Sequence, residues 1–172
     1  MPEQSPLNFA VIGAGAWGTA VAVHLARRNQ RATLVTRRPE HAVAMQLARE
    51  NRDYLPGVKL PDTLTVTSDV RAALLEADVV LIASPSHALR EWGQRMQAEL
   101  GGAGRIQLLI SLVKGLEVGT QLRASEIMAA SFPGLNVATL TGPTNAAEVA
   151  QGLPSAMVLA AASPGPFVEQ VQ

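Results

Sequence analysis

Three glycines near the amino terminus are the residues whose type and spacing point most directly to chemistry. Gly13, Gly15 and Gly18 lie in the segment Gly-Ala-Gly-Ala-Trp-Gly, between the apolar run Leu7–Ile12 and a helix-forming stretch that reaches about Arg28. In such a turn the first glycine permits a sharp bend, the second lets the backbone approach a diphosphate, and the third lets helix and strand pack closely. Free amides at the helix start, aided by the helix dipole, bind phosphate oxygens. A glycine turn can be merely structural, but a strand, a helix and a second strand in this order favour dinucleotide binding.

The residues after the second apolar run, Ala32–Val35, indicate which dinucleotide would bind. NAD-binding domains commonly carry an acidic residue about 20 positions after the glycines, where it binds the ribose hydroxyls. This sequence has Thr36-Arg37-Arg38 there. Arginine makes charge-assisted hydrogen bonds to a 2′-phosphate, which a carboxylate would repel. We therefore expect NADPH to be favoured over NADH, with contacts at Arg37 and Arg38, although either arginine could be a solvated surface charge.

Two later segments offer groups for a phosphorylated substrate. Lys114 follows the apolar run Ile106–Ile110, near the carboxyl edge of the predicted sheet, where open α/β sheets bind ligands. Its ammonium could attract a phosphate or polarise a ketone oxygen, and a solvent-facing loop lysine is the alternative. The segment Gly142-Pro143-Thr144 follows the run Val137–Leu140 and is predicted to start a helix at the same edge. An ordinary helix cap would use the same residue types.

The elements that must position these residues alternate along the chain. Short apolar runs separated by amphipathic stretches are typical of βαβ units, so we predict an α/β fold: a Rossmann-type, doubly wound, mostly parallel sheet with helices on both faces. On the predicted helices, Trp92 and Met96 are expected in the core, and Val43 and Leu47 share one face. The predicted strands are 7–12, 32–35, 64–67, 79–83, 106–110, 137–140 and 156–160, and the predicted helices run from the glycine turn to about 28, from 38–40 onward, and over 69–77, 86–100 and 120–131.

Composition excludes several classes of protein. The 172 residues carry no net charge and no cysteine, so there is no basic footprint for nucleic acid and no disulfide or cysteine-based metal site. His24, His41 and His87 are scattered without metal-ligand spacing, and no metal is expected. The segment Met1–Ser5 lacks the basic and apolar regions of a signal peptide, and no apolar run could span a bilayer. We therefore expect a cytoplasmic protein without membrane insertion.

Five segments, taken in order over nearly the whole chain, resemble those of one family. The family is the bacterial-type NAD(P)-dependent glycerol-3-phosphate dehydrogenases. The segments are the glycine turn with Trp-Gly-Thr-Ala at 13–20, Asn-Arg-Asp-Tyr-Leu-Pro-Gly-Val-Lys-Leu-Pro at 51–61, Ala-Ser-Pro-Ser at 83–86, Lys-Gly-Leu-Glu at 114–117, and Gly-Pro-Thr at 142–144 with Ala146 and Glu148-Val149. Five ordered matches are far more specific than the glycine motif alone.

The resemblance implies a function and a set of contacts. Members interconvert sn-glycerol 3-phosphate and dihydroxyacetone phosphate by hydride transfer with NAD(P), for glycerophospholipid precursor synthesis, and the full-length enzyme could be a homodimer. Ala16 stands where many members have serine, and Asn145 where an aromatic residue is usual. The implied cofactor contacts are Ala16, Trp17, Arg37, Arg38, Lys114 and Ala146, and the implied substrate contacts are Lys114, Gly142 and Thr144.

The resemblance also implies a helical second domain that carries the catalytic acid/base lysine and an Asn-Arg pair. That domain would need about 150 further residues. We expect 1–172 to form one dinucleotide-binding domain, with about 160–172 leading toward the carboxyl-terminal substrate domain. No catalytic residue is then expected in this chain, which alone should bind cofactor weakly and turn over little. Two other interpretations are a Rossmann reductase of the β-hydroxyacid or ketopantoate type and a non-catalytic NAD(P)-sensing module.

Overall fold

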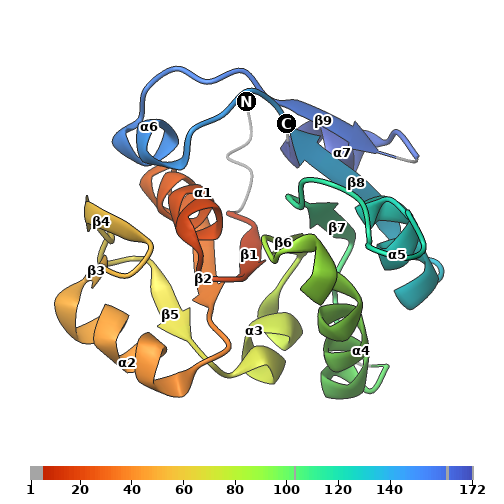
Figure 1. The fold of residues 1–172 in the computed structure, drawn as a ribbon, viewed down its shortest axis with the longest axis horizontal. Coiled ribbons are helices and arrows are strands. Elements are labelled where there is room, and N and C mark those ends of the chain that lie inside the picture. Colours follow the sequence, from red (N-terminus) through yellow and green to blue (C-terminus); the bar gives the residue numbers. More distant parts are fainter. Residues whose placement is uncertain (1–5, 103, 162, 172) are drawn as a thin grey trace.

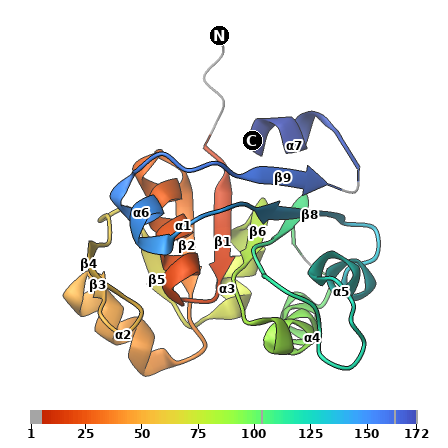
Figure 2. The same cartoon turned by 45° about the horizontal axis from the view of Figure 1, so that its top comes forward.

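A seven-stranded sheet forms the middle layer of the computed structural model, which describes residues 6–102, 104–161 and 163–171 (Figures 1 and 2). The segment Met1–Ser5, used above to argue against a signal peptide, lies outside these residues. The strands of the sheet are β1 (Asn8–Ile12), β2 (Arg31–Val35), β5 (Thr65–Thr67), β6 (Val79–Ile82), β7 (Leu108–Ser111), β8 (Asn136–Thr141) and β9 (Val158–Ala161). All seven predicted strands are present, and their ends differ from the predicted ones by no more than two residues.

The strand order places a ligand-binding crevice at the centre of the sheet. The order is β5-β2-β1-β6-β7-β8-β9, with β9 alone antiparallel to its neighbour. From β1 the chain first builds the sheet outward through β2 and then returns to build from β6 in the other direction, so the order reverses between β1 and β6. Ligands of open α/β sheets bind at the carboxyl ends of the strands at such a switch point. Because Ile12 pairs with both Val35 and Ile82, the ends of β1, β2 and β6 lie level there.

Helices cover both faces of the sheet, as predicted for a doubly wound fold. Alternate residues of β1 enter opposite cores: Val11 packs in one cluster, whereas Ala10 and Ile12 pack in the other. Over the described residues, no helix is both long and apolar enough to cross a membrane. On the Val11 side lie α1 (Ala16–Arg27), α2 (Pro39–Ala48), α6 (Ala146–Gln151), α7 (Pro166–Val171) and a hairpin of β3 (Glu50–Asn51) and β4 (Leu55–Lys59), and on the other side lie α3 (Val70–Glu76), the 3-10 turn η1 (Ser86–Ala88), α4 (Leu89–Leu100) and α5 (Ala124–Ser131).

The apolar face expected from the sequence is buried in helix α4 but exposed in helix α2. Trp92 and Met96 of α4 are core residues, which confirms the prediction. Val43 and Leu47 share a face of α2, but that face is exposed to 53% and 82%. The helix instead buries Ala42, Met45 and the ring of His41, because it packs against the edge strand β5 and the β3–β4 hairpin. The hairpin itself was not predicted.

Two predicted helix starts are also displaced. The helix expected to open at Gly142-Pro143-Thr144 begins at Ala146: the Thr144 amide donates to the Gly142 carbonyl in a turn, and the Asn145 side chain caps α6. The helix expected over 120–131 begins at Ala124, because Gln121 takes a positive φ of 58° that ends any helix there.

Candidate cofactor site

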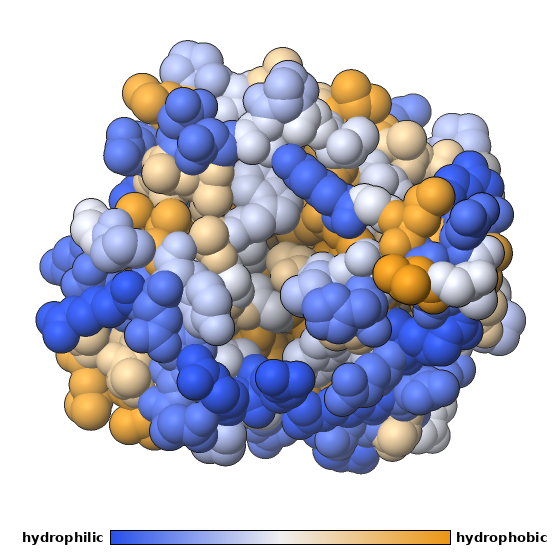
Figure 3. Space-filling model, in the orientation of Figure 1, coloured by the Kyte–Doolittle hydropathy of each residue, from blue (hydrophilic) through white to orange (hydrophobic). Residues whose placement is uncertain are grey.

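One cleft of about 650 Å³ opens where β1, β2, β6 and β7 end. Figure 3 shows the hollow near the middle of this face, with pale to apolar surface inside and hydrophilic residues along its lower rim. Of the eleven site residues predicted from sequence, nine line this cleft, and Gly18 and Gly142 do not. The nine are Gly13, Gly15, Ala16, Trp17, Arg37, Arg38, Lys114, Thr144 and Ala146.

The three glycines of the turn meet three different surroundings. Gly13 has φ +110°, and a Cβ on it would lie 2.7 Å from the Ala83 carbonyl oxygen. A Cβ on Gly18 would lie 1.9 Å from the Gly13 carbonyl oxygen, so this glycine lets α1 pack against the turn. A Cβ on Gly15 would have no protein atom within 4 Å among the described residues. The open space beside Gly15 is where a diphosphate would approach the backbone.

The amino end of α1 is free to receive an anion. Gly15 is its N-cap, and within the described residues no side chain caps it and no acidic residue stands in the first turn. The amides of the first helical turn therefore point toward the cleft without an internal anion, and the helix dipole adds a partial positive charge. No carboxylate is among the described residues that line the cleft, whereas Arg37, Arg38 and Lys114 are. The residues present thus fit a dinucleotide diphosphate.

The two arginines at the end of β2 differ in their partners. Arg38 forms ion pairs with Asp53 at 3.4 Å and with Glu40 at 3.9 Å. Arg37 is exposed and, in the part of the chain that the structure describes, has no ion-pair partner. Because an unpaired guanidinium need not give up a partner to bind phosphate, Arg37 is the stronger candidate for a 2′-phosphate.

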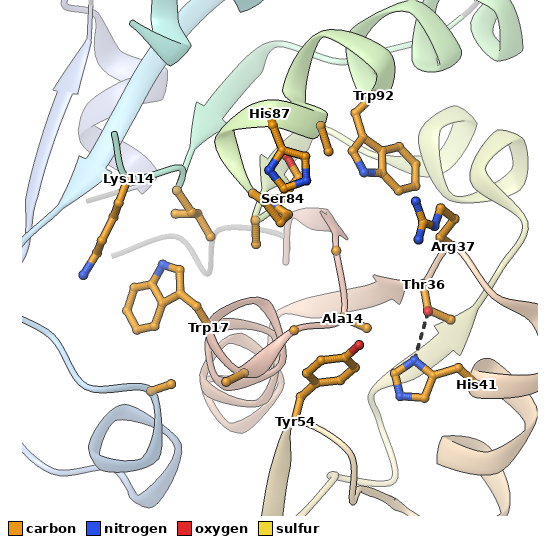
Figure 4. A pocket seen from close by; sticks show the side chains of 18 of the residues that line it. Ala14, Trp17, Thr36, Arg37, His41, Tyr54, Ser84, His87, Trp92 and Lys114 are labelled. Atoms are coloured by element: carbon orange, nitrogen blue, oxygen red, sulfur yellow. Dashed lines mark hydrogen bonds between the residues drawn. The ribbon is translucent and has the colours of Figure 1, made fainter. Parts of the chain in front are cut away.

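Three polar residues that the sequence analysis did not assign to the site stand beside these arginines. Thr36, His41 and Tyr54 line the same end of the cleft, and Figure 4 shows them opposite Trp17 and Lys114. The His41 and Tyr54 rings meet edge to face, with centroids 5.6 Å apart. Tyr54 could have been suspected from its place in the Tyr-Leu-Pro-Gly segment. A histidine inside an ordinary helical pattern gives no comparable signal.

At the other end of the cleft, Lys114 extends from the loop after β7 (Figure 4). Its loop is held by Glu117, which accepts hydrogen bonds from Arg90 of α4 at 2.8 Å through both carboxylate oxygens and another from the Thr120 hydroxyl. Hydrogen bonding to Arg90, then to Thr120, lowers the pKa of Glu117 to about 2. Thr144 and Ala146 line the cleft as well. Gly142 instead packs against the segment that precedes β9, where a Cβ on Gly142 would lie 2.3 Å from the Ala156 carbonyl oxygen.

A glycine turn at the switch point of this strand order defines a Rossmann-type dinucleotide-binding domain. Residues 8–165 match the family described as NAD-dependent glycerol-3-phosphate dehydrogenase N-terminus. The chain therefore belongs to this family: it is the N-terminal, NAD-binding domain of an NAD(P)-dependent glycerol-3-phosphate dehydrogenase. This assignment displaces the alternative of a β-hydroxyacid or ketopantoate reductase.

Individual relatives agree with the family assignment. The chain is 45% identical over 156 residues to the NAD(P)+ glycerol-3-phosphate dehydrogenase of Hydrogenovibrio crunogenus, covering 90% of this chain and 45% of the relative. It is 42% identical to that of Moorella thermoacetica, with the same coverage. The crystal structure of glycerol-3-phosphate dehydrogenase from Coxiella burnetii superposes with a TM-score of 0.87 at 33% identity, over 96% of this chain and 50% of that one. The chain thus spans about half the length of the relatives it matches.

Proposed function

We propose that the cleft binds NADPH or NADH, with NADPH favoured. The diphosphate lies on the glycine turn beside Gly15, the adenosine end lies at Thr36 and Arg37, and the nicotinamide lies toward Lys114. The observation that carries the proposal is the convergence of nine sequence-predicted site residues from distant segments on one cleft at the switch point. Its cationic lining, free of carboxylates among the described residues, matches the negative charge of a dinucleotide.

We infer further that the chain is the cofactor-binding part of an enzyme that interconverts sn-glycerol 3-phosphate and dihydroxyacetone phosphate. Bound NAD(P) supplies the hydride carrier for this reaction. Lys114 attracts the substrate phosphate or polarises the ketone oxygen, whose negative charge grows during reduction. Thr144, which lines the cleft, offers a hydroxyl to the substrate, whereas Gly142 packs away from the cleft and is not assigned a substrate contact. The acid/base group is expected in the half of the relatives' length that this chain does not span.

Calorimetric titration of the purified chain with NADPH and with NADH tests the cofactor site. We expect saturable binding of both, tighter for NADPH, because the 2′-phosphate adds charge-assisted hydrogen bonds with arginine. No heat and no saturation with either cofactor would overturn the proposal.

The activity of the isolated chain is a separate test. We expect little or no reduction of dihydroxyacetone phosphate by the chain alone, because one wall of the substrate pocket is supplied by the second domain. A normal turnover number for the 172-residue chain would contradict the division of labour proposed here.

A further inference from the structure

Three buried polar side chains connect the proposed adenosine end of the cleft to the glycine turn. Thr36 is 4% exposed, His41 is 6% exposed and Asn51 is fully buried. We propose that this chain of hydrogen bonds makes the Thr36 hydroxyl an acceptor for a ribose hydroxyl of the cofactor, and so a residue that retains NADH beside the arginines that favour NADPH. The inference rests on the proposed binding of NAD(P) in this cleft.

Asn51 fixes the direction of the whole chain of bonds. Its Nδ2 lies 3.0 Å from the Ala14 carbonyl oxygen and 2.8 Å from Thr19 Oγ1. Because a carbonyl oxygen can only accept, the amide nitrogen and not the amide oxygen must face Ala14. Asn51 Oδ1 is therefore turned the other way, to 3.2 Å from His41 Nε2.

The orientation of Asn51 selects one tautomer of His41. Asn51 Oδ1 only accepts, so His41 Nε2 carries the hydrogen, and Nδ1 of the neutral ring presents a lone pair. Thr36 Oγ1 lies 3.1 Å from Nδ1, and Figure 4 draws this contact as the dashed line. The single hydrogen of the Thr36 hydroxyl is thereby donated to His41. Only its lone pairs remain for a ligand.

The surroundings of His41 support this tautomer. Asp53 is the nearest carboxylate, with Oδ2 3.8 Å from Nε2, farther than Asn51 Oδ1. Its side chain is 59% exposed and also pairs with Arg38 at 3.4 Å. Both acceptors therefore face Nε2, and the Tyr54 ring covers the imidazole from the side. The hydrogen on Nε2 is favoured by every polar contact of that ring atom.

Thr36 occupies the position at which Rossmann domains read the adenosine ribose. It directly follows β2, its amide donates to the Thr67 carbonyl at 2.9 Å, and it lines the cleft. NAD-binding relatives of this fold carry a carboxylate there to accept from the ribose hydroxyls. A threonine whose hydrogen is already donated offers the same acceptor without the negative charge.

The acceptor distinguishes the two cofactors. The 2′-hydroxyl of NADH can donate to Thr36, whereas the 2′-phosphate of NADPH is largely without hydrogen at neutral pH and cannot. The neighbouring Arg37 has the opposite preference, since it pairs with phosphate. Thr36 and Arg37 thus favour different cofactors from adjacent positions, which accounts for a site that accepts both.

Calorimetric titration of Thr36→Val and Thr36→Ser with NADH and with NADPH tests the inference. Thr36→Val keeps the shape but removes the acceptor, and we expect NADH to bind about three- to tenfold more weakly, with NADPH changed by less than about twofold. Thr36→Ser should restore NADH binding. Equal weakening of both cofactors by Thr36→Val would overturn this inference alone, whereas a parent chain that binds neither cofactor would overturn the proposed function and this inference with it.

A second measurement needs no cofactor. Long-range nitrogen–proton NMR correlations of the apo chain report which ring nitrogen of His41 carries hydrogen, and we expect Nε2. Hydrogen on Nδ1 would overturn the inference.

Asp78→Asn is a control for the calorimetric titrations. It disturbs the hydrogen bonds to Asn8 and Arg105 at the opposite edge of the sheet, and should lower stability without changing the ratio of NADH to NADPH affinity.

Discussion

The two ends of the cleft are built to different degrees within this chain. At the adenosine end, Thr36, His41 and Asn51 are buried and joined by hydrogen bonds that reach the glycine turn. At the other end, Lys114 is exposed, and Leu116 and Val118 in the same loop are 52% and 86% exposed. The polar side chains of the cleft are thus held by internal hydrogen bonds at the proposed adenosine end, whereas Lys114 at the other end is left open to solvent.

The largest predicted effect tests the exposed end. Lys114→Ala in the complete enzyme should lower kcat/KM for dihydroxyacetone phosphate by about 10²–10³-fold, because the substrate phosphate or the growing charge on the ketone oxygen loses its cation. NADPH affinity should change by less than about tenfold, since most cofactor contacts lie elsewhere. Steady-state kinetics and cofactor titration separate the two effects. Lys59→Ala is the matched control, as the other lysine of the chain lies exposed on β4, and it should leave both unchanged.

The glycine turn between the two ends gives the next largest effect. Gly18→Ala places a Cβ 1.9 Å from the Gly13 carbonyl oxygen, so we expect the free energy of unfolding to fall by about 3 kcal/mol, with loss of cofactor binding. Gly15→Ala has no neighbour within 4 Å among the described residues and should cost at most about 1 kcal/mol, because alanine is a poorer N-cap than glycine. It should nevertheless weaken NADPH, because its methyl group stands where the diphosphate lies. Denaturant unfolding and calorimetry distinguish the two variants. Normal NADPH binding by Gly15→Ala would contradict the proposed position of the diphosphate beside Gly15.

The third prediction sharpens the description of the adenosine end. Arg37→Ala should weaken NADPH by about tenfold and NADH by much less, because it removes a charge-assisted hydrogen bond to the 2′-phosphate. Arg38→Ala should have a smaller effect, since Arg38 is already paired with Asp53 and Glu40. Parallel titrations of both variants with both cofactors measure the difference. Equal losses of NADPH and NADH affinity in Arg37→Ala would refute its contact with the 2′-phosphate.

The contrast between the ends also separates what the sequence could predict from what it could not. Local signals predicted the strands, the glycine turn and the burial of Trp92 and Met96, because each depends on residues close together in the chain. The apolar face of α2 was not the buried one, because its buried side is set by packing against the β3–β4 hairpin. That hairpin contains Pro56 and Gly57, which weaken the sequence pattern of a strand.

Contacts between distant segments account for the remaining differences. The spatial pairing of Asn51 with Ala14, 37 positions apart, leaves no periodic trace in the sequence. The packing of Gly142 against Ala156 also leaves no sequence pattern. Gly142 was therefore predicted to contact the substrate on the basis of motif resemblance. The polar network of the proposed adenosine end and the full set of residues that line the cleft therefore could not be predicted from the sequence.

The smallest predicted effect concerns the contact that anchors the Lys114 loop. Glu117 has a side chain only 13% exposed, and hydrogen bonds from Arg90 and then from Thr120 lower its pKa from 4.5 to about 2. Because the folded-state pKa lies below the ordinary value, the pair stabilises the fold fully above pH 4.5, and this contribution is lost as the pH falls through about 2. Glu117→Gln should lower the melting temperature by about 1–2 °C at pH 7, since Arg90 is partly exposed and solvent screens the pair. The difference from the parent chain should shrink between pH 4.5 and pH 2 in calorimetric scans. Glu91→Gln, on the helix α4 that also carries Arg90, should show a smaller difference. A difference that persists unchanged to pH 2 would mean that Glu117 holds the loop by shape and not by charge, and the exposed end would then be positioned without an ionic anchor.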